Sequence, residues 1–178
     1  MGVKYENLDN RTREFMIEEL ELDISSGKLY VSPRLNPNGQ KNWESLLREA
    51  IQGHDDEWLA NELQKRSYMN TREVRSTRSG GTTLAKVPVT APETLAEGEF
   101  NRFYARGLCA RAIDEGITDV EVYRGKQVQR PRPESQAKIG MKYAAKALLD
   151  DLRTSQGVEP SLGIPPGPNS GLTIRLPP

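Results

Sequence analysis

The chain has 178 residues, and its formal net charge is zero because 25 basic residues balance 25 acidic ones. That length suits one domain, or one domain with an appendage, and is long enough to bury a core without metals or disulfides. The single cysteine excludes an internal disulfide, and no stretch approaches the roughly 20 apolar residues of a membrane span. We therefore expect a soluble, intracellular protein without membrane contact.

The charged residues are arranged in blocks of alternating sign. There are 7 basic and 13 acidic residues in 1–64, 6 and 1 in 65–87, 4 and 7 in 88–124, and 8 and 4 in 125–178. Such blocks can pair within one molecule or between neighbouring copies in an assembly. Duplex DNA binding usually needs one large basic field, so the pattern disfavours nucleic acid as a partner.

Residues 1–64 form an acidic N-terminal unit that we expect to be helical. Apolar side chains at helical spacing predict a helix over 10–20, capped by the polar residues at its start. A short strand is predicted at 28–32, followed by a loop that contains proline and glycine. Two further helices over 42–53 and 54–66 have apolar stripes that can face each other, which predicts an αα-hairpin.

Residues 65–87 are predicted to be a basic, flexible connector, because the apolar periodicity fades there. Glycine, serine and threonine gather around four basic side chains: Arg72, Arg75, Arg78 and Lys86. These cations could contact phosphate or an acidic partner. A solvated linker is the simpler interpretation, since no aromatic residue after Tyr68 is placed to stack on bases.

Residues 88–156 are predicted to form a central helix–strand–helix unit. A long helix runs from Thr90 to Gly116, and a half-buried strand follows at 120–124. Residues 125–141 are expected to be a loop, and 142–153 a second helix. One side of the long helix is expected to be core: Leu95, Phe100, Phe103, Tyr104, Leu108, Ala112 and Ile113.

Residues 157–178 are interpreted as an extended, proline-rich C-terminal arm. Residues 172–176 alternate apolar and polar side chains, as one strand does, and such a strand can add to the edge of a sheet. The edge is either the chain's own or that of a neighbouring subunit. In the second case, truncation after Gly157 leaves the helical domain folded but weakens assembly. The partner-binding residues are then Val158, Leu162, Ile164, Leu172, Ile174, Arg175 and Leu176.

No assembled catalytic, cofactor-binding or metal-binding constellation is present in the sequence, so we expect a protein that is not an enzyme. His54 lies at a helix junction and is expected on the surface, and Cys109 falls inside the long helix as a small buried residue. Glu97 and Glu99 form the one carboxylate pair of interest. Their convergence on one concave pocket would favour catalysis, and their pointing into open solvent would exclude it.

A charged row of three residues, Glu99, Arg102 and Arg106, lies beside the apolar side of the long helix. A surface row of ion pairs is the favoured interpretation, and each such pair stabilises a helix by only tenths of a kcal/mol. The row could instead bind a partner carboxylate, or form a polar network with Arg130, Arg132 and Glu134.

Five segments resemble an uncharacterised family of small proteins from tailed bacteriophages and prophages, associated with the head (capsid) gene region. They are AEGEFNRFYARGLCARAIDEG (96–116), PRPES (131–135), PPGPNSGLTIRLP (165–177), LYVSPRLNPNGQ (29–40) and DDEWLANEL (55–63). The likeness spans nearly the whole chain, but none of these motifs has a defined chemistry. The resemblance implies a virion component made in the bacterial host cytoplasm, such as a capsid-associated, decoration or head-completion protein.

These observations predict an α+β fold, a mainly helical small domain with a short strand pair and an extended Pro-rich C-terminal arm. The expected function is non-enzymatic: a structural protein that binds neighbouring subunits of an assembly, a capsid or other head protein or further copies of itself, through the arm. The alternative is a small nucleic-acid-binding or regulatory factor that uses the basic connector. We expect no cofactor and no metal.

Overall fold

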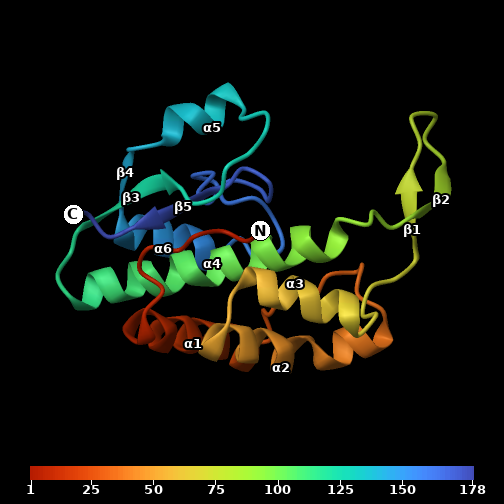
Figure 1. Cartoon of the computed structure of the whole chain (residues 1–178), viewed down its shortest axis with the longest axis horizontal. Coiled ribbons are helices and arrows are strands. Elements are labelled where there is room, and N and C mark those ends of the chain that lie inside the picture. Colours follow the sequence, from red (N-terminus) through yellow and green to blue (C-terminus); the bar gives the residue numbers. More distant parts are fainter.

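The computed structural model describes all residues, 1–178, and has an α+β fold with two small antiparallel sheets (Figure 1). This confirms the predicted class. None of its helices has the length and apolar character that crossing a membrane requires. The elements in chain order are α1 Asn10–Ser25, α2 Pro37–Gly53, α3 Asp56–Lys65, β1 Arg72–Ser76, β2 Thr82–Lys86, α4 Ala91–Asp114, β3 Asp119–Arg124, α5 Pro133–Lys138, β4 Lys142–Ala144, α6 Ala145–Arg153 and β5 Leu172–Arg175.

Helix α4 is the centre of the molecule, with α1 to α3 on one side and the β4-β3-β5 sheet with α6 on the other (Figure 1). Pro92 suits its first turn, and Gly116 adopts a φ of +73° just beyond its end, as predicted. Its middle is buried on nearly every side, whereas the sequence predicts that only one side of the helix is core. Ile113, predicted to be core, is instead exposed.

Close packing between α1 and α4 depends on Gly107. A Cβ atom at this position would lie 2.5 Å from the Met16 Cγ atom and 2.8 Å from the Met16 backbone nitrogen. No side chain fits there, because real Cβ atoms do not approach backbone so closely. The glycine therefore lets α1 lie directly against α4, and this contact places the acidic residues of α1 over the middle of α4.

Each of the first three helices begins at a polar cap. The side chains of Asp9, Asn36 and Asp55 accept hydrogen bonds from backbone N–H groups in the first turns of α1, α2 and α3. The αα-hairpin of α2 and α3 is confirmed, but α2 begins at Pro37, within the predicted loop. The predicted strand at 28–32 is wrong, because the Tyr30 carbonyl accepts the indole N–H of Trp43 rather than a strand partner.

The C-terminal segment packs against its own domain, so the extended arm was a wrong prediction. β5 is an edge strand of the β4-β3-β5 sheet, and Ile174 lies opposite Val122 of β3. The alternation at 172–176 therefore did predict a strand, and that strand adds to the chain's own sheet. The Asn101 amide of α4 donates to the Leu172 carbonyl at 2.9 Å, which ties β5 to the central helix.

The tight turn into β5 requires Gly171. Its φ is +70°, and a Cβ atom there would lie 2.1 Å from the Lys126 carbonyl oxygen. The Gly171 carbonyl accepts hydrogen bonds from the backbone N–H groups of Gly125 and Lys126. This turn fixes the register of β5 on β3, and the preceding proline-rich loop is thereby held against α4.

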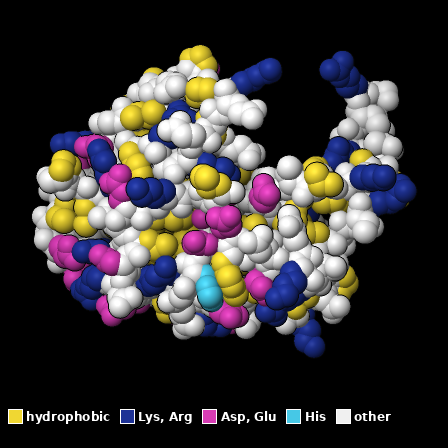
Figure 2. All heavy atoms as spheres, in the orientation of Figure 1, with side chains coloured by type: hydrophobic (Ala, Val, Ile, Leu, Met, Phe, Trp, Pro, Cys, Tyr) yellow, Lys and Arg dark blue, Asp and Glu magenta, His cyan; other side chains and the backbone are white.

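The predicted flexible connector is instead a β-hairpin. β1 and β2 pair antiparallel over five residues each, and the hairpin projects away from the helical body (Figure 1). We call residues 71–87 the hairpin arm, since the Val87 N–H donates to the Thr71 carbonyl at its base. Figure 2 shows basic side chains along this projection. The arm packs on the rest of the chain only at its base, where Arg34 pairs with Glu73 at 2.7 Å.

Candidate functional site

The hairpin arm has one face that nothing in the chain covers. Val74 of β1 lies directly opposite Leu84 of β2, and these side chains are 69% and 59% exposed. On the same face, Arg72 lies opposite Lys86 at the base of the arm. Like charges directly opposite each other destabilise a strand pair. The arm thus presents an apolar pair beside two cations that have no acidic partner on that face.

The opposite face of the arm is mainly polar, and some of its polar groups have hydrogen-bond partners within the chain. Glu73 accepts hydrogen bonds from Arg34 and Arg75, whose guanidinium groups lower the pKa of its carboxyl. Thr83 and Ala85 complete this face. The exposed apolar pair is therefore confined to one face of the arm.

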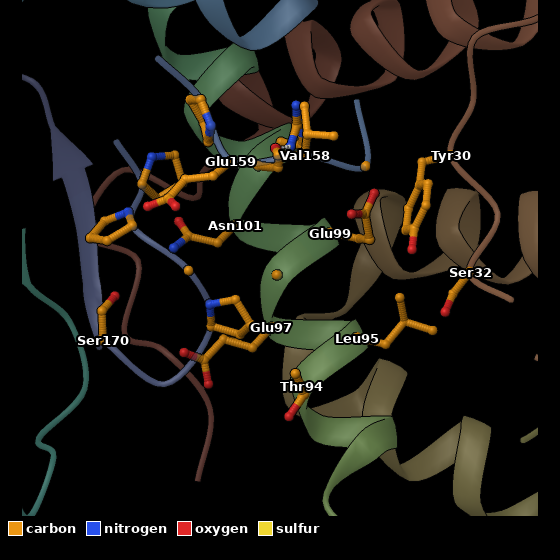
Figure 3. A pocket seen from close by; sticks show the side chains of 18 of the residues that line it. Tyr30, Ser32, Thr94, Leu95, Glu97, Glu99, Asn101, Val158, Glu159 and Ser170 are labelled. Carbon is orange, nitrogen blue, oxygen red and sulfur yellow. Dashed lines mark hydrogen bonds between the residues drawn. The ribbon is translucent and has the colours of Figure 1, made fainter. Parts of the chain in front are cut away.

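A second feature is a cleft of about 410 Å³ beside the N-terminal half of α4. Its floor is the surface of α4 from Thr94 to Arg102, one wall is the segment 30–34, and the other is the C-terminal loop over 157–160 and 165–170. Figure 3 shows Tyr30 on one side of the helix and Ser170 on the other. Its volume falls in the usual range of small-ligand sites, about 300–1,000 Å³.

Most charged groups of the cleft are already neutralised or bonded by other residues. Glu97, 4% exposed, pairs with the Lys126 ammonium at 2.7 Å and accepts the Asn169 N–H. Arg34 is paired with Glu73 at the base of the hairpin arm. The Arg102 guanidinium donates to the Val158 carbonyl and to the Ser155 hydroxyl. These contacts hold the C-terminal loop on α4.

Glu99 differs from these groups. It is 8% exposed and lines the cleft, but no hydrogen bond or ion pair neutralises its carboxylate. Burial raises the pKa of this carboxyl to about 7, while Arg102 and Arg106 act on it only through space. A buried, unpartnered carboxylate in a concave site is the kind of group that binds a ligand or a proton.

Glu97 and Glu99 both line the same cleft, and their convergence there would favour a catalytic interpretation. However, the Glu97 and Glu99 side chains lie on opposite sides of α4 and point away from each other (Figure 3). Two carboxylates that act on one bond must flank that bond. The arrangement therefore offers one free carboxylate rather than an acid–base pair.

The predicted surface row of Glu99, Arg102 and Arg106 was wrong, because all three side chains are buried. Arg106 is fully enclosed and donates to both carboxylate oxygens of Asp23, at 2.6 and 2.9 Å, and to Glu19 at 2.9 Å. These partners come from α1 and not from the predicted set at 130–134. The network is structural, since it fastens α1 to α4 and excludes solvent.

The seven predicted partner-binding residues are separated by the fold. Ile164, Leu172 and Ile174 are fully buried in the chain's own core, so they cannot contact a neighbour. Arg175 forms ion pairs with Glu121 and Glu6 of its own chain. The remaining three are not fully buried: Val158 and Leu162 are exposed, and Leu176 is partly buried against the core.

No family model, curated protein or solved structure matches this chain. The resemblance to the family of small tailed-bacteriophage proteins therefore stays an expectation from the sequence motifs.

Two residues considered for chemistry have structural roles in the fold. Cys109 is fully buried, as predicted, and burial raises the pKa of its thiol. His54 is exposed, as predicted, and its ring stacks on Trp58 with 4.0 Å between the centroids.

The cleft residues Tyr30 and Arg34 were not predicted, because they are far from α4 in the sequence. Charged residues recurring between Phe100 and Leu108 were the available signal that part of α4 binds polar groups.

Proposed function

We propose that the chain is a non-enzymatic assembly protein that docks on a neighbouring protein subunit through the hairpin arm. The main support is the exposed Val74–Leu84 pair on an arm that projects from a well-packed body. An isolated two-stranded hairpin is marginally stable in water, and burial of an apolar face is the usual way such a hairpin gains stability.

The chemistry of the exposed face specifies the partner. Val74 and Leu84 favour an apolar patch, and the neighbouring Arg72 and Lys86 favour acidic side chains beside it. An acidic residue placed between the two cations would relieve their repulsion on binding. The partner surface is therefore apolar at its centre and acidic at the side nearest the base of the arm.

The proposed setting is the virion of a tailed bacteriophage, with the protein bound to a capsid or other head protein. The sequence resemblance supports this setting, and a compact body with one projecting arm suits a subunit that bridges to a neighbour. Contact through the hairpin arm takes the place of contact through the C-terminal segment, whose strand is committed to its own sheet.

A second candidate function is nucleic-acid binding by the same arm. Two-stranded β-ribbons fit the major groove of DNA, and Arg75 and Arg78 are exposed on this ribbon. Protein docking is favoured, because an exposed apolar pair has no use against phosphates. The arm has four cations, Arg72, Arg75, Arg78 and Lys86, so binding to a 20-base-pair duplex that weakens by about 100-fold between about 50 and 200 mM salt would instead support the nucleic-acid function.

The test compares two double variants in particle incorporation. Val74→Ser with Leu84→Ser removes the apolar pair, and Thr83→Ser with Ala85→Ser is the control that places serine at two positions of the opposite face without removing a large apolar side chain. Tagged chains are supplied in cells that produce the phage, and their amount in purified particles is measured. We expect the first variant to be depleted at least tenfold and the control to be retained. Equal incorporation of both would contradict docking through this face, and absence of the unmodified chain from particles would contradict the virion setting.

A further inference from the structure

The cleft beside α4 is a second site, independent of the hairpin arm and of the proposed assembly function. It is formed by three segments that are distant in the sequence, namely 30–34, 94–102 and 157–170. Its other charged groups either have partners or, like Glu159, are exposed to solvent. Glu99 alone is buried in the cleft without a hydrogen-bonded partner.

The surroundings of Glu99 identify the class of group that would satisfy it. Figure 3 shows its carboxylate directed toward the side of the cleft that holds the Tyr30 ring. A single carboxylate beside an aromatic ring suits an organic cation, since the ring face attracts positive charge and the carboxylate neutralises it. Hard metal ions need several oxygen ligands, whereas this site offers one free carboxylate.

The rest of the cleft supplies apolar contact for a stem attached to the cation. Leu95 lies on the floor, and four prolines line the C-terminal wall: Pro160, Pro165, Pro166 and Pro168. We propose that the cleft binds an ammonium or guanidinium group on an apolar stem, with the Glu99 carboxylate as counter-ion. The cation has two possible sources, a free small molecule or an arginine or lysine side chain of a protein.

The charged groups near the site set its pH dependence. Those that face Glu99 or share the cleft with it are Glu97, Arg102 and Arg106 on α4, Asp23 on α1, Tyr30 and Arg34 before α2, and Glu159 in the C-terminal loop; Glu97 is paired with Lys126. The guanidinium groups stay charged throughout the accessible range. With the empty-site pKa of Glu99 at about 7, protonation weakens cation binding roughly tenfold between pH 8 and pH 6.

The experiment uses a matched pair of probes, n-butylguanidinium and n-butylurea, which share shape but differ in charge. Each is titrated into the full chain at pH 8, and binding is followed by nuclear magnetic resonance shifts of residues around the cleft. We expect n-butylguanidinium to bind at least tenfold more tightly than n-butylurea. Glu99→Gln should abolish that preference. Glu93→Gln, an exposed carboxylate on the same helix outside the cleft, should keep it.

A third probe, Nα-acetyl-arginine methylamide, distinguishes the two sources. Tighter binding than n-butylguanidinium supports an arginine side chain presented by a protein, and weaker binding supports a free small cation. Equal binding of the charged and neutral probes, no binding of either, or an unchanged preference in folded Glu99→Gln would each overturn the proposal. A preference that does not weaken between pH 8 and pH 6 would also overturn it, since Glu99 would then not be the counter-ion.

Discussion

The C-terminal segment and the hairpin arm exchange the roles that their sequences suggest. The C-terminal segment is rich in proline, yet Ile164, Leu172 and Ile174 are fully buried and β5 completes a sheet. The hairpin arm looks like a linker, yet it is a regular β-hairpin whose Val74 and Leu84 are exposed. The first region stabilises the domain, and the second extends from it.

The difference lies in what each strand can pair with. β3 has two edges, and β4 occupies one of them, so β5 finds a free edge within the same molecule. β1 and β2 have only each other, and no helix lies over their apolar pair. An apolar side chain thus contributes to folding in the C-terminal segment, whereas in the hairpin arm it is available for binding another protein.

Truncation after Gly157 should have the largest effect. It removes β5 and three fully buried side chains, each of which would cost about 2–5 kcal/mol if cut back to alanine. Their sum rivals the total stability of an ordinary domain, about 5–15 kcal/mol. We expect loss of the cooperative thermal transition in circular dichroism. A truncated chain that melts like the intact one would restore the interpretation of this segment as a free arm.

Ile174→Ala should lower the free energy of unfolding by about 2–5 kcal/mol, because Ile174 is enclosed opposite Val122. The matched variant is Leu84→Ala, which shortens an exposed branched side chain in a strand and should change stability by less than about 0.5 kcal/mol. Urea denaturation of both variants measures the difference. Similar values for the two would remove the distinction between the regions.

Glu99→Gln tests the cleft that the C-terminal loop encloses. The folded pKa of about 7 lies above the usual 4.5, so the carboxyl destabilises the folded chain once it ionises, and stability falls as pH rises from 4.5 through 7. The variant should therefore gain about 3 kcal/mol relative to the unmodified chain between pH 4 and pH 8. Asp56, whose pKa is raised to about 6 by burial, contributes equally to both proteins. A pH-independent difference would show that Glu99 has a partner in solution.

The smallest expected change is in the hairpin arm itself. Replacing Val74 and Leu84 together by serine should alter the free energy of unfolding by less than about 1 kcal/mol, because both side chains are largely exposed. The same variant should lose partner binding. A large loss of stability, measured by urea denaturation, would show that the arm belongs to the core and would remove it as a docking surface.

The parts of the fold that were predictable are those with strong local signals. α4 has a periodic apolar pattern, a proline in its first turn and Gly116 at its end, and it was predicted almost to its boundaries. The alternation at Leu172–Arg175 predicted a strand, but a two-residue period does not state which sheet edge the strand joins. β1 and β2 were missed because each has a single large apolar residue, although Gly80 and Gly81 between two short alternating runs were a hairpin signal.

The cleft could not be predicted from the sequence, for a different reason. The sequence identifies Glu99 as one of a carboxylate pair, but the cleft around it is completed by Tyr30 and the loop at 157–160, which only the folded chain brings to α4. Arg106 was placed on the surface because a charged residue usually lies there, and its enclosure depends on two carboxylates from α1. In both cases, the surroundings of the side chain are formed by residues that are distant in the sequence.

The central claim is that the C-terminal segment is part of the folded domain, whereas the hairpin arm only projects from it. Amide hydrogen exchange followed by mass spectrometry tests this claim most directly, since it reports on both regions in one experiment. The claim predicts that the peptide covering Leu172–Arg175 exchanges as slowly as α4, because β5 opens only when the domain unfolds. Peptides covering the hairpin arm should exchange several orders of magnitude faster. Fast exchange at 172–175 together with slow exchange in the arm would contradict the account.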